Sequence, residues 1–275
     1  MSDNIVTADD GGLANEVGNW AEDKHQRLKH YVGIASGPRK KFLGPGKAGA
    51  TYIDPYCAMG RAKIRNTNKF IDGSSILAWQ ESTNKKAKFS HVHIGDVEPR
   101  AVEQNSTRLH KLHAPVSTYN GTADKTIPEI CKKLDPYGLH FAFLDPYNLG
   151  ALPFTIIERL CSVKRMDLLI HVSSQDLQRN FDRYLAGETD ALDRFAPGWR
   201  NSVTPNASAA QQRNDVFQYW LNLIERTGKT PSSNIEHVKG SRNQTLYWLV
   251  LVSGHELADK FWKKVSNVSG QFEFF

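Results

Sequence analysis

The fold of this chain is decided by two stretches, Tyr52-Ile53-Asp54-Pro55-Tyr56-Cys57-Ala58-Met59-Gly60-Arg61 and Phe141-Ala142-Phe143-Leu144-Asp145-Pro146-Tyr147. Each contains a short apolar run that ends in Asp-Pro-Tyr. A strand that stops at Asp-Pro has a carboxylate and a turn without a backbone N–H donor at its carboxyl end. Ligands bind at that edge in open α/β sheets. Two such edges therefore predict a cofactor loop and a catalytic loop side by side.

Strand-like and helix-like segments alternate on both sides of these stretches. The alternation predicts an α/β fold with a mostly parallel sheet. Two later segments, separated by a polar turn, predict an antiparallel C-terminal hairpin. The expected strands cover residues 52–54, 91–95, 116–119, 141–144 and 168–172, the helices 20–36, 75–80, 100–112, 127–133, 211–226 and 256–265, and the hairpin 235–238 and 245–252 with its turn at 239–243.

The length of 275 residues suits one decorated domain better than two complete ones. Residues 1–18 are rich in Asp, Asn and Gly, which predicts a flexible N-terminus ahead of a domain spanning 19–275. Residues 175–207 are highly charged and interrupt the alternation of strands and helices. They predict an insertion or lid over the sheet.

Charge and cysteine content limit the possible partners. The net charge of +6 permits an anionic partner such as nucleic acid, and general solubility explains it equally well. No apolar run approaches the length of a membrane span, so we expect no membrane partner. Cys57, Cys131 and Cys161 lack the spacing of a zinc site or a disulfide framework. We therefore expect no metal and a reduced, cytoplasmic setting.

The segment 54–60 consists mainly of small residues, as expected where backbone approaches a ligand closely. Gly60 can adopt a positive φ that other residues avoid. The segment lacks the glycine patterns of nucleotide-triphosphate and dinucleotide sites. Asp54 is a candidate acceptor for an amino-bearing cofactor, and capping of the following turn is its alternative role.

Acidic residues also follow the next two expected strands. Asp96 is well placed to accept both hydroxyls of a ribose, and Val97 could lie against an adenine face. Glu98 is better explained by the dipole of the helix that follows. Asp124, after Ala123, could accept from an adenine amino group or cap a helix.

The stretch Asp145-Pro146-Tyr147 combines two acceptors, the carboxylate and the proline carbonyl, with a flat aromatic ring. Such a set could hold an exocyclic amine while a ring stacks on the tyrosine. Its contribution would be mostly positioning. His91 and His93 share one face of a strand, where surface polarity is a better explanation than a metal pair.

Together these motifs resemble S-adenosylmethionine-dependent methyltransferases, especially those acting on exocyclic amines of bases. More narrowly, the chain from about Trp20 onward is similar to the three-Cys-motif partner protein family (TcmP). Two positions depart from the pattern: Ala58 stands where amino-methyltransferases usually have Gly, and Pro146 stands where base methyltransferases usually have two prolines. The matching segments are Lys24-His25 with Tyr31, Tyr52-Ile53-Asp54, Gly73-Ser74, 141–147, 167–170, Arg179-Asn180 and Trp262.

The resemblance implies a Rossmann-like class I methyltransferase sheet with an inserted helical or loop segment, and S-adenosylmethionine as cofactor. It implies that the acceptor nitrogen lies at Asp145, Pro146 and Tyr147, with a nucleic-acid base as the first hypothesis. The implied cofactor-binding residues are Asp54, Tyr56, Cys57, Ala58, Gly60, Asp96, Val97, Ala123 and Asp124. The implied phosphate contacts are Arg39, Lys40, Lys41, Lys47, Arg179 and Arg183.

The family name refers to a neighbouring protein of radical-S-adenosylmethionine type with three cysteines, which is a candidate partner. A second hypothesis is a catalytically inactive methyltransferase fold that binds nucleic acid or that partner. Ala58 and the single proline favour it slightly. A nicotinamide-dependent enzyme is a third hypothesis, disfavoured by the missing glycine pattern.

Overall fold

The computed structural model describes residues 5–240 and 245–266, and its centre is an eight-stranded sheet. The strands follow the order β10-β12-β9-β8-β3-β6-β7, and β11 pairs with β12. The bounds are β3 Ala50–Asp54, β6 His91–Asp96, β7 Val116–Asn120, β8 Leu139–Leu144, β9 Met166–Val172, β10 Thr230–Pro231, β11 Glu236–Lys239 and β12 Thr245–Ser253.

The middle of this sheet is parallel, as predicted. β3 pairs in parallel with β6 and β8, β6 with β7, and β8 with β9. β11 and β12 form the predicted antiparallel hairpin, although residues 241–243 of its turn lie outside the described residues. From β3 the chain moves outward to β6 and β7, then returns to β8 on the other side of β3. In Rossmann-like sheets, ligands bind beside such a reversal, and the two Asp-Pro-Tyr stretches flank it.

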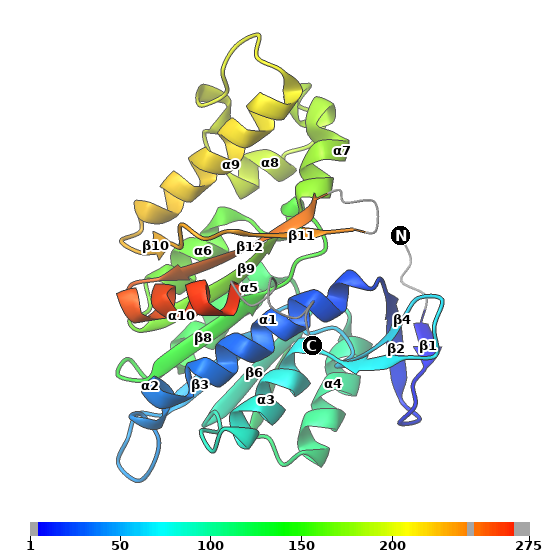
Figure 1. Cartoon of the computed structure of the whole chain (residues 1–275), viewed down its shortest axis with the longest axis vertical. Coiled ribbons are helices and arrows are strands. Elements are labelled where there is room, and N and C mark those ends of the chain that lie inside the picture. The colour runs from blue at the N-terminus through cyan, green and yellow to red at the C-terminus, as the bar shows by residue number, and fades with distance from the viewer. Residues whose placement is uncertain (1–4, 241–244, 267–275) are drawn as a thin grey trace, which may run out of the picture.

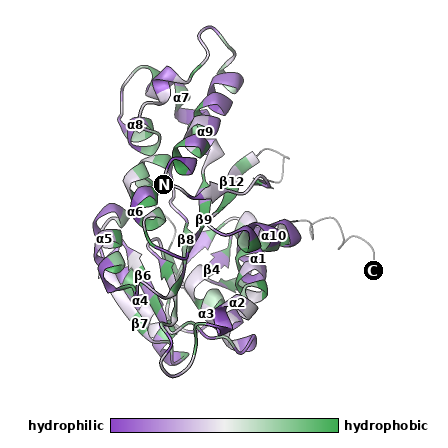
Figure 2. Ribbon diagram, turned by 90° about the vertical axis from the view of Figure 1, so that its left-hand side faces the viewer, coloured by the Kyte–Doolittle hydropathy of each residue, from purple (hydrophilic) through white to green (hydrophobic). Residues whose placement is uncertain are grey.

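Helices cover both faces of the sheet, with α1 and α10 on one side and α5 and α6 on the other (Figure 2). Residues of β8 alternate between the two cores: Phe141 and Phe143 face one, and Ala142 and Leu144 face the other. The first core also contains α3 and α4, and the second α7 and α9. The bounds are α1 Trp20–Ile34, α3 Ser74–Asn84, α4 Pro99–Lys111, α5 Ala123–Lys133, α6 Phe154–Cys161, α7 Ser174–Leu185, α9 Ala209–Glu225 and α10 Glu256–Ser266.

The N-terminal segment differs from its prediction. Instead of a flexible lead, β1 (Ile5–Thr7) and β2 (Leu13–Val17) form a hairpin within a second, four-stranded sheet. The other strands, β4 (Arg61–Ile64) and β5 (Phe70–Asp72), directly follow the first Asp-Pro-Tyr stretch. β2 pairs in parallel with β4, so residues 13–17 are held by a later segment of the chain. Residues 1–4 of the predicted flexible N-terminus lie outside the described residues.

The segment predicted as an insertion or lid is mainly helical. Residues 175–207 hold most of α7 together with α8 (Ala191–Phe195) and the 3-10 helix η2 (Trp199–Asn201). With α9, these helices lie together at one end of the molecule, beyond the sheet (Figure 1). In the part of the chain that the structure describes, no helix is both long and apolar enough to cross a membrane.

Candidate functional site

Four titratable side chains gather at the carboxyl edge of the sheet because of strand alternation. Asp54, Asp96, Asp145 and His171 each lie two residues beyond a core residue on the same face of the sheet, after Tyr52, Ile94, Phe143 and Leu169. These residues belong to β3, β6, β8 and β9 or directly follow them, and the four strands are neighbours. The fold therefore places all four side chains on the face that α1 covers.

The β3 loop, residues 55–60, has an unusual backbone. Ala58 and Gly60 both adopt left-handed conformations, with φ of 46° and 76°. Gly73, just before α3, donates its N–H to the Gly60 carbonyl at 2.9 Å. A Cβ on Gly73 would lie 2.8 Å from the Cα of Gly60, so only glycine permits this approach. The start of α3 is thereby packed against the loop.

Side chains of α4 hold three successive carbonyl groups of the β3 loop. Asn105 Nδ2 donates to the Cys57 carbonyl at 2.7 Å and to that of Ala58 at 3.3 Å. Arg108 Nη1 donates to the Met59 carbonyl at 2.6 Å. In a trans peptide the N–H points away from the C=O, so these bonds turn the following N–H groups away from α4.

One N–H group of this loop is bonded to an acid at the edge of the sheet. The Ala58 N–H donates to Asp96 Oδ2 at 3.0 Å. Among the described residues, no acceptor is hydrogen-bonded to the N–H of Met59 or of Gly60. The loop thus presents donors to an anionic group, in the manner of a backbone nest.

Asp54 is completely buried and has no cationic partner among the described residues. Its carboxyl accepts from Ser74 Oγ at 2.5 Å, from the Tyr52 hydroxyl at 3.2 Å, and from the Tyr56 N–H at 3.4 Å. Burial raises the pKa of Asp54 to about 7, although these hydrogen bonds oppose the shift. Asp54 therefore anchors the start of the β3 loop and does not reach the surface.

Asp96 lies where a ribose-binding acid was predicted. Besides the bond from Ala58, its Oδ1 accepts from the Glu98 N–H at 3.0 Å. Burial raises the pKa of Asp96 above its usual value. Each oxygen of a carboxylate can accept more than one hydrogen bond, so this side chain retains acceptor capacity for hydroxyl groups.

The remaining predicted cofactor residues surround the same edge. Val97 is 62% exposed directly after Asp96, and Asp124 is exposed in the first turn of α5. Ala123 and Cys57 are buried, and burial raises the pKa of the Cys57 thiol. Tyr56 is half-buried, and its hydroxyl donates to the Ala151 carbonyl at 2.6 Å, within η1 (Leu149–Ala151).

Asp145 is bound by two side chains that the sequence interpretation did not assign to the site. Lys24 of α1 forms an ion pair with Asp145 Oδ2, and His171 Nδ1 lies 2.5 Å from Asp145 Oδ1. Burial alone would raise the pKa of Asp145, but Lys24 and His171 outweigh it and hold that pKa well below its usual value. Burial lowers the pKa of His171. Since the Asp145 carboxylate can only accept, Nδ1 of His171 donates this hydrogen bond.

Two ring nitrogens of histidines, one in α1 beside Lys24 and one in His171 itself, have no hydrogen-bond partner within the described residues. They are Nε2 of His171 and Nδ1 of His25, and both are buried. His171 also packs edge-on against Tyr247, with ring centroids 4.0 Å apart. A signal for Lys24 was present in the sequence, because Lys24, Leu28 and Tyr31 share the i, i+4, i+7 spacing of one buried helix face. No comparable local signal marked His171.

Tyr147 has the highest exposure among the large apolar side chains of the described residues, at 82%. It follows Pro146, which is buried. No donor among the described residues is hydrogen-bonded to the Pro146 carbonyl. Tyr147 and Pro146 thus offer a free ring and a free acceptor, whereas the Asp145 carboxylate is already engaged.

The predicted phosphate contacts do not form one surface. Lys40, Lys41 and Lys47 are exposed, but they precede β3 and lie at its amino end, opposite the edge that carries Asp54. Arg179 and Arg183 are exposed on α7, which starts after the carboxyl end of β9. Arg183 also contacts Glu188 at 3.0 Å.

Arg39 requires a correction. It is only 2% exposed, its Nε donates to the Ala87 carbonyl at 2.6 Å, and its guanidinium lies over the Phe89 ring at 4.5 Å. A guanidinium buried in this way supports the packing of α2 (Ser36–Lys40) and is not available to a phosphate.

No family model and no curated protein matches the chain. Among solved structures, a Legionella pneumophila str. Philadelphia 1 protein described under the family model DUF519 has a TM-score of 0.51 and 7% identity, covering 90% of this chain and 92% of that one. The methyltransferase domain of a bacterial Hen1 has a TM-score of 0.44 and 13% identity, covering 84% and 97%. A putative RNA methyltransferase from Pyrococcus horikoshii has a TM-score of 0.43 and 7% identity, covering 85% and 88%. At such identities the similarity concerns the fold alone.

Proposed function

We propose that this chain is an S-adenosylmethionine-dependent methyltransferase that transfers a methyl group to an amine nitrogen of a nucleic-acid base. The observation that carries this proposal is the pairing of Asp96 with the β3 loop at the reversal point of the sheet. Asp96 ends β6, beside a loop whose backbone is left-handed at two residues and has N–H donors without acceptors among the described residues. This arrangement suits a nucleoside that carries an amino acid group.

The residues present fit that cofactor. Asp96 keeps acceptor capacity for the two ribose hydroxyls, and the exposed Val97 offers an apolar surface to adenine. Asp124 is exposed for the adenine amino group, and the N–H groups of Met59 and Gly60 are available to the cofactor's carboxylate. When bound, the cofactor would supply an electrophilic methyl group on a sulfonium.

The acceptor would lie over Tyr147. The exposed ring can stack on a flat base, and the Pro146 carbonyl can accept from an exocyclic N–H and orient the nitrogen lone pair. Asp145, kept ionised by Lys24, would act through its charge and not as a free acceptor. Phosphate contacts are expected from Arg179 and Arg183 on α7, the two predicted arginines nearest this edge.

Membership of TcmP, a radical-S-adenosylmethionine-type partner and a cytoplasmic setting are proposals that rest on the sequence motifs. They are independent of the cofactor assignment. Copurification of the chain with such a partner, before and after nuclease treatment, would test the partner proposal.

Calorimetry with S-adenosylmethionine tests the cofactor assignment. We expect wild type to bind and Asp96→Ala to lose about 1.5–3 kcal/mol of binding free energy, because hydrogen bonds to a carboxylate are lost. Glu98→Ala is the matched control, since Glu98 is exposed and two residues away. Absence of binding by wild type, or equal binding by Asp96→Ala and Glu98→Ala, would overturn the assignment.

The acceptor proposal has a separate test. Transfer of a labelled methyl group to DNA, RNA and protein fractions should identify an acceptor class with wild type. Tyr147→Ala should keep cofactor affinity but reduce transfer at least tenfold, about the loss of one base–aromatic stack. Unchanged transfer would remove Tyr147 from the acceptor site.

A catalytically inactive module is the second candidate. Two observations favour it: Ala58 occupies a left-handed position that suits glycine, and the Asp145 carboxylate is already ion-paired with Lys24 and hydrogen-bonded to His171. Mass spectrometry of the denatured protein discriminates the two candidates. Copurified S-adenosylmethionine or its demethylated product would argue against the inactive module.

A further inference from the structure

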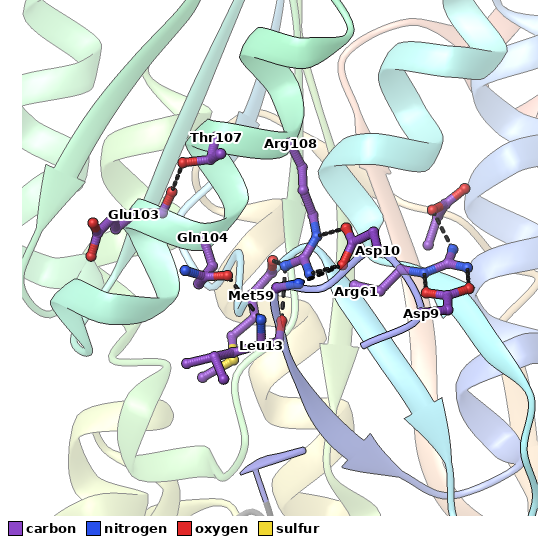
Figure 3. A network of polar contacts seen from close by, with 11 residues as sticks. Asp9, Asp10, Leu13, Met59, Arg61, Glu103, Gln104, Thr107 and Arg108 are labelled. Atoms are coloured by element: carbon purple, nitrogen blue, oxygen red, sulfur yellow. Dashed lines mark hydrogen bonds and ion pairs between the residues drawn. The ribbon is translucent and has the colours of Figure 1, made fainter. Parts of the chain in front are cut away.

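The turn of the N-terminal hairpin is tied to α4 by a bidentate ion pair (Figure 3). Arg108 Nε donates to Asp10 Oδ2 at 2.7 Å, and Arg108 Nη2 donates to Asp10 Oδ1 at 2.8 Å. Next to it, Gln104 Oε1 accepts from the Leu13 N–H at 2.9 Å. A Cβ on Gly12 would lie 2.6 Å from Arg108 Nη2 and 2.8 Å from Gln104 Oε1, so a larger residue there would displace these two side chains.

The same guanidinium also holds the β3 loop. Arg108 Nη1 donates both to the Leu13 carbonyl at 2.9 Å and to the Met59 carbonyl at 2.6 Å. The Arg108 side chain is only 8% exposed, whereas that of Asp10 is 37% exposed. The nearly buried Arg108 therefore connects the exposed carboxylate of Asp10 to the peptide group between Met59 and Gly60.

Asp10 fixes the orientation of Arg108. A planar guanidinium held by two carboxylate bonds has its remaining N–H groups aimed in set directions. The hydrogen bond from Arg108 holds the pKa of Asp10 well below its usual range, so the carboxylate stays charged. Asn105, one turn earlier, holds the preceding loop carbonyls, but it makes no contact with the hairpin among the described residues.

We propose that the Asp10–Arg108 ion pair is a latch through which the N-terminal hairpin fixes the β3 loop in its cofactor-binding conformation. Arg108 is then a positioning residue, and the hairpin of β1 and β2 supports the β3 loop through it. The expected effect on S-adenosylmethionine affinity rests on the proposed function. The mechanical coupling of the hairpin to the β3 loop does not.

The latch predicts that loss of the Asp10 charge loosens Met59 and Gly60. Asp10→Asn in the full chain should weaken S-adenosylmethionine binding about tenfold, the equivalent of one charge-assisted hydrogen bond. The matched control is Asp9→Asn. Asp9 forms an equally bidentate pair with Arg61, at 2.9 and 2.6 Å, but Arg61 contacts no β3-loop carbonyl among the described residues (Figure 3).

Hydrogen exchange without cofactor tests the mechanical part. The amide of Ala58, whose N–H is bonded to Asp96, should exchange at least fivefold faster in Asp10→Asn than in Asp9→Asn, while the amides of β6 exchange alike in both variants. Arg108→Lys should resemble Asp10→Asn, because an ammonium cannot span the carboxylate and both carbonyls.

The outcomes separate the two proposals. Equal loop exchange in Asp10→Asn and Asp9→Asn would overturn the latch, whatever the binding result. Faster loop exchange with unchanged affinity would also overturn it, since the loop conformation would then not matter for binding. Absence of binding by wild type would instead refute the cofactor assignment, and the exchange comparison would then decide the mechanical coupling by itself.

Discussion

Asp54 and Asp145 stand in identical Asp-Pro-Tyr sequences at the ends of neighbouring parallel strands, yet their carboxyl groups are in opposite states. Asp54 accepts only from hydroxyls and a backbone N–H, and burial raises its pKa to about 7. Asp145 pairs with Lys24 and His171, which overcome burial and keep its pKa well below the usual value. At neutral pH the first is partly protonated and the second is fully ionised.

The difference comes from partners distant in sequence. Lys24 is contributed by α1, 121 residues before Asp145, and His171 by the adjacent strand. A local motif therefore fixes where a carboxyl lies, while the surrounding helices and strands fix its charge. This distinction separates Asp54, which anchors the β3 loop, from Asp145, which remains charged beside Tyr147.

The largest effect should come from removing the cation at Asp145. Lys24→Met leaves a buried carboxylate without its ion-pair partner, and we expect the free energy of unfolding at neutral pH to fall by about 3–5 kcal/mol. This loss of unfolding free energy should become smaller at lower pH, because without Lys24 the Asp145 carboxylate can take up a proton. Urea denaturation at pH 7 and pH 5 measures both effects.

Lys29→Met is the control for that variant, since Lys29 is exposed on the same helix. Its unfolding free energy should change by less than about 0.5 kcal/mol. The double variant Lys24→Met/Asp145→Asn should recover part of the loss. Equal stability of Lys24→Met and Lys29→Met would mean that the ion pair does not hold Asp145.

Asp54 should give the next largest effect, through pH. Its folded pKa of about 7 exceeds the usual 3.8, so between these values the native state binds a proton that the unfolded state has lost. The contribution of Asp54 to the free energy of unfolding should therefore decline as pH rises through this window, by up to about 4 kcal/mol in total. Asp54→Asn, which cannot ionise, should lack this decline. Parallel stability curves for the two proteins from pH 4 to pH 8 would contradict the assignment.

Ala58 should give the smallest effect. A left-handed alanine is strained by about 1–2 kcal/mol, but glycine adds about 0.4–1 kcal/mol of unfolded-state entropy. Ala58→Gly should therefore stabilise the protein by about 0.5–1 kcal/mol and leave the Asp145 cluster unaffected. Thermal denaturation measures this change, and a lower midpoint would show that the Ala58 methyl group makes favourable contacts.

The central sheet was predictable from the sequence because its strands are encoded locally. The apolar segment at 141–144 ends at Asp-Pro, and the strand does end at Leu144. The N-terminal hairpin was not predictable, because its strands are short and β2 is ordered by parallel pairing with β4. Composition rich in Asp and Gly suggested flexibility, whereas Asp10 and Gly12 are the residues that dock the hairpin on α4.

The positions of the carboxyl groups in the candidate site were predictable, but their ionisation states were not. Strand ends placed Asp54, Asp96 and Asp145 at one edge, since parallel strands share their carboxyl ends. The pairing of Asp145 with Lys24 depends on how α1 packs across the sheet, and no local sequence motif predicts that packing. Arg39 shows the converse: a basic run suggested an exposed contact, while aromatic packing from Phe89 buries the side chain.

The latch between Asp10 and Arg108 joins residues 98 positions apart. During synthesis at about 5–20 residues per second, the arginine follows the aspartate by roughly 5–20 s. For the first part of that interval the hairpin has neither β4 nor α4 to dock against, because both follow it in the chain. The hairpin therefore docks only after β4 and α4 have been made. Both precede β7 to β12 in the chain, so the β3 loop can be fastened before the central sheet is complete.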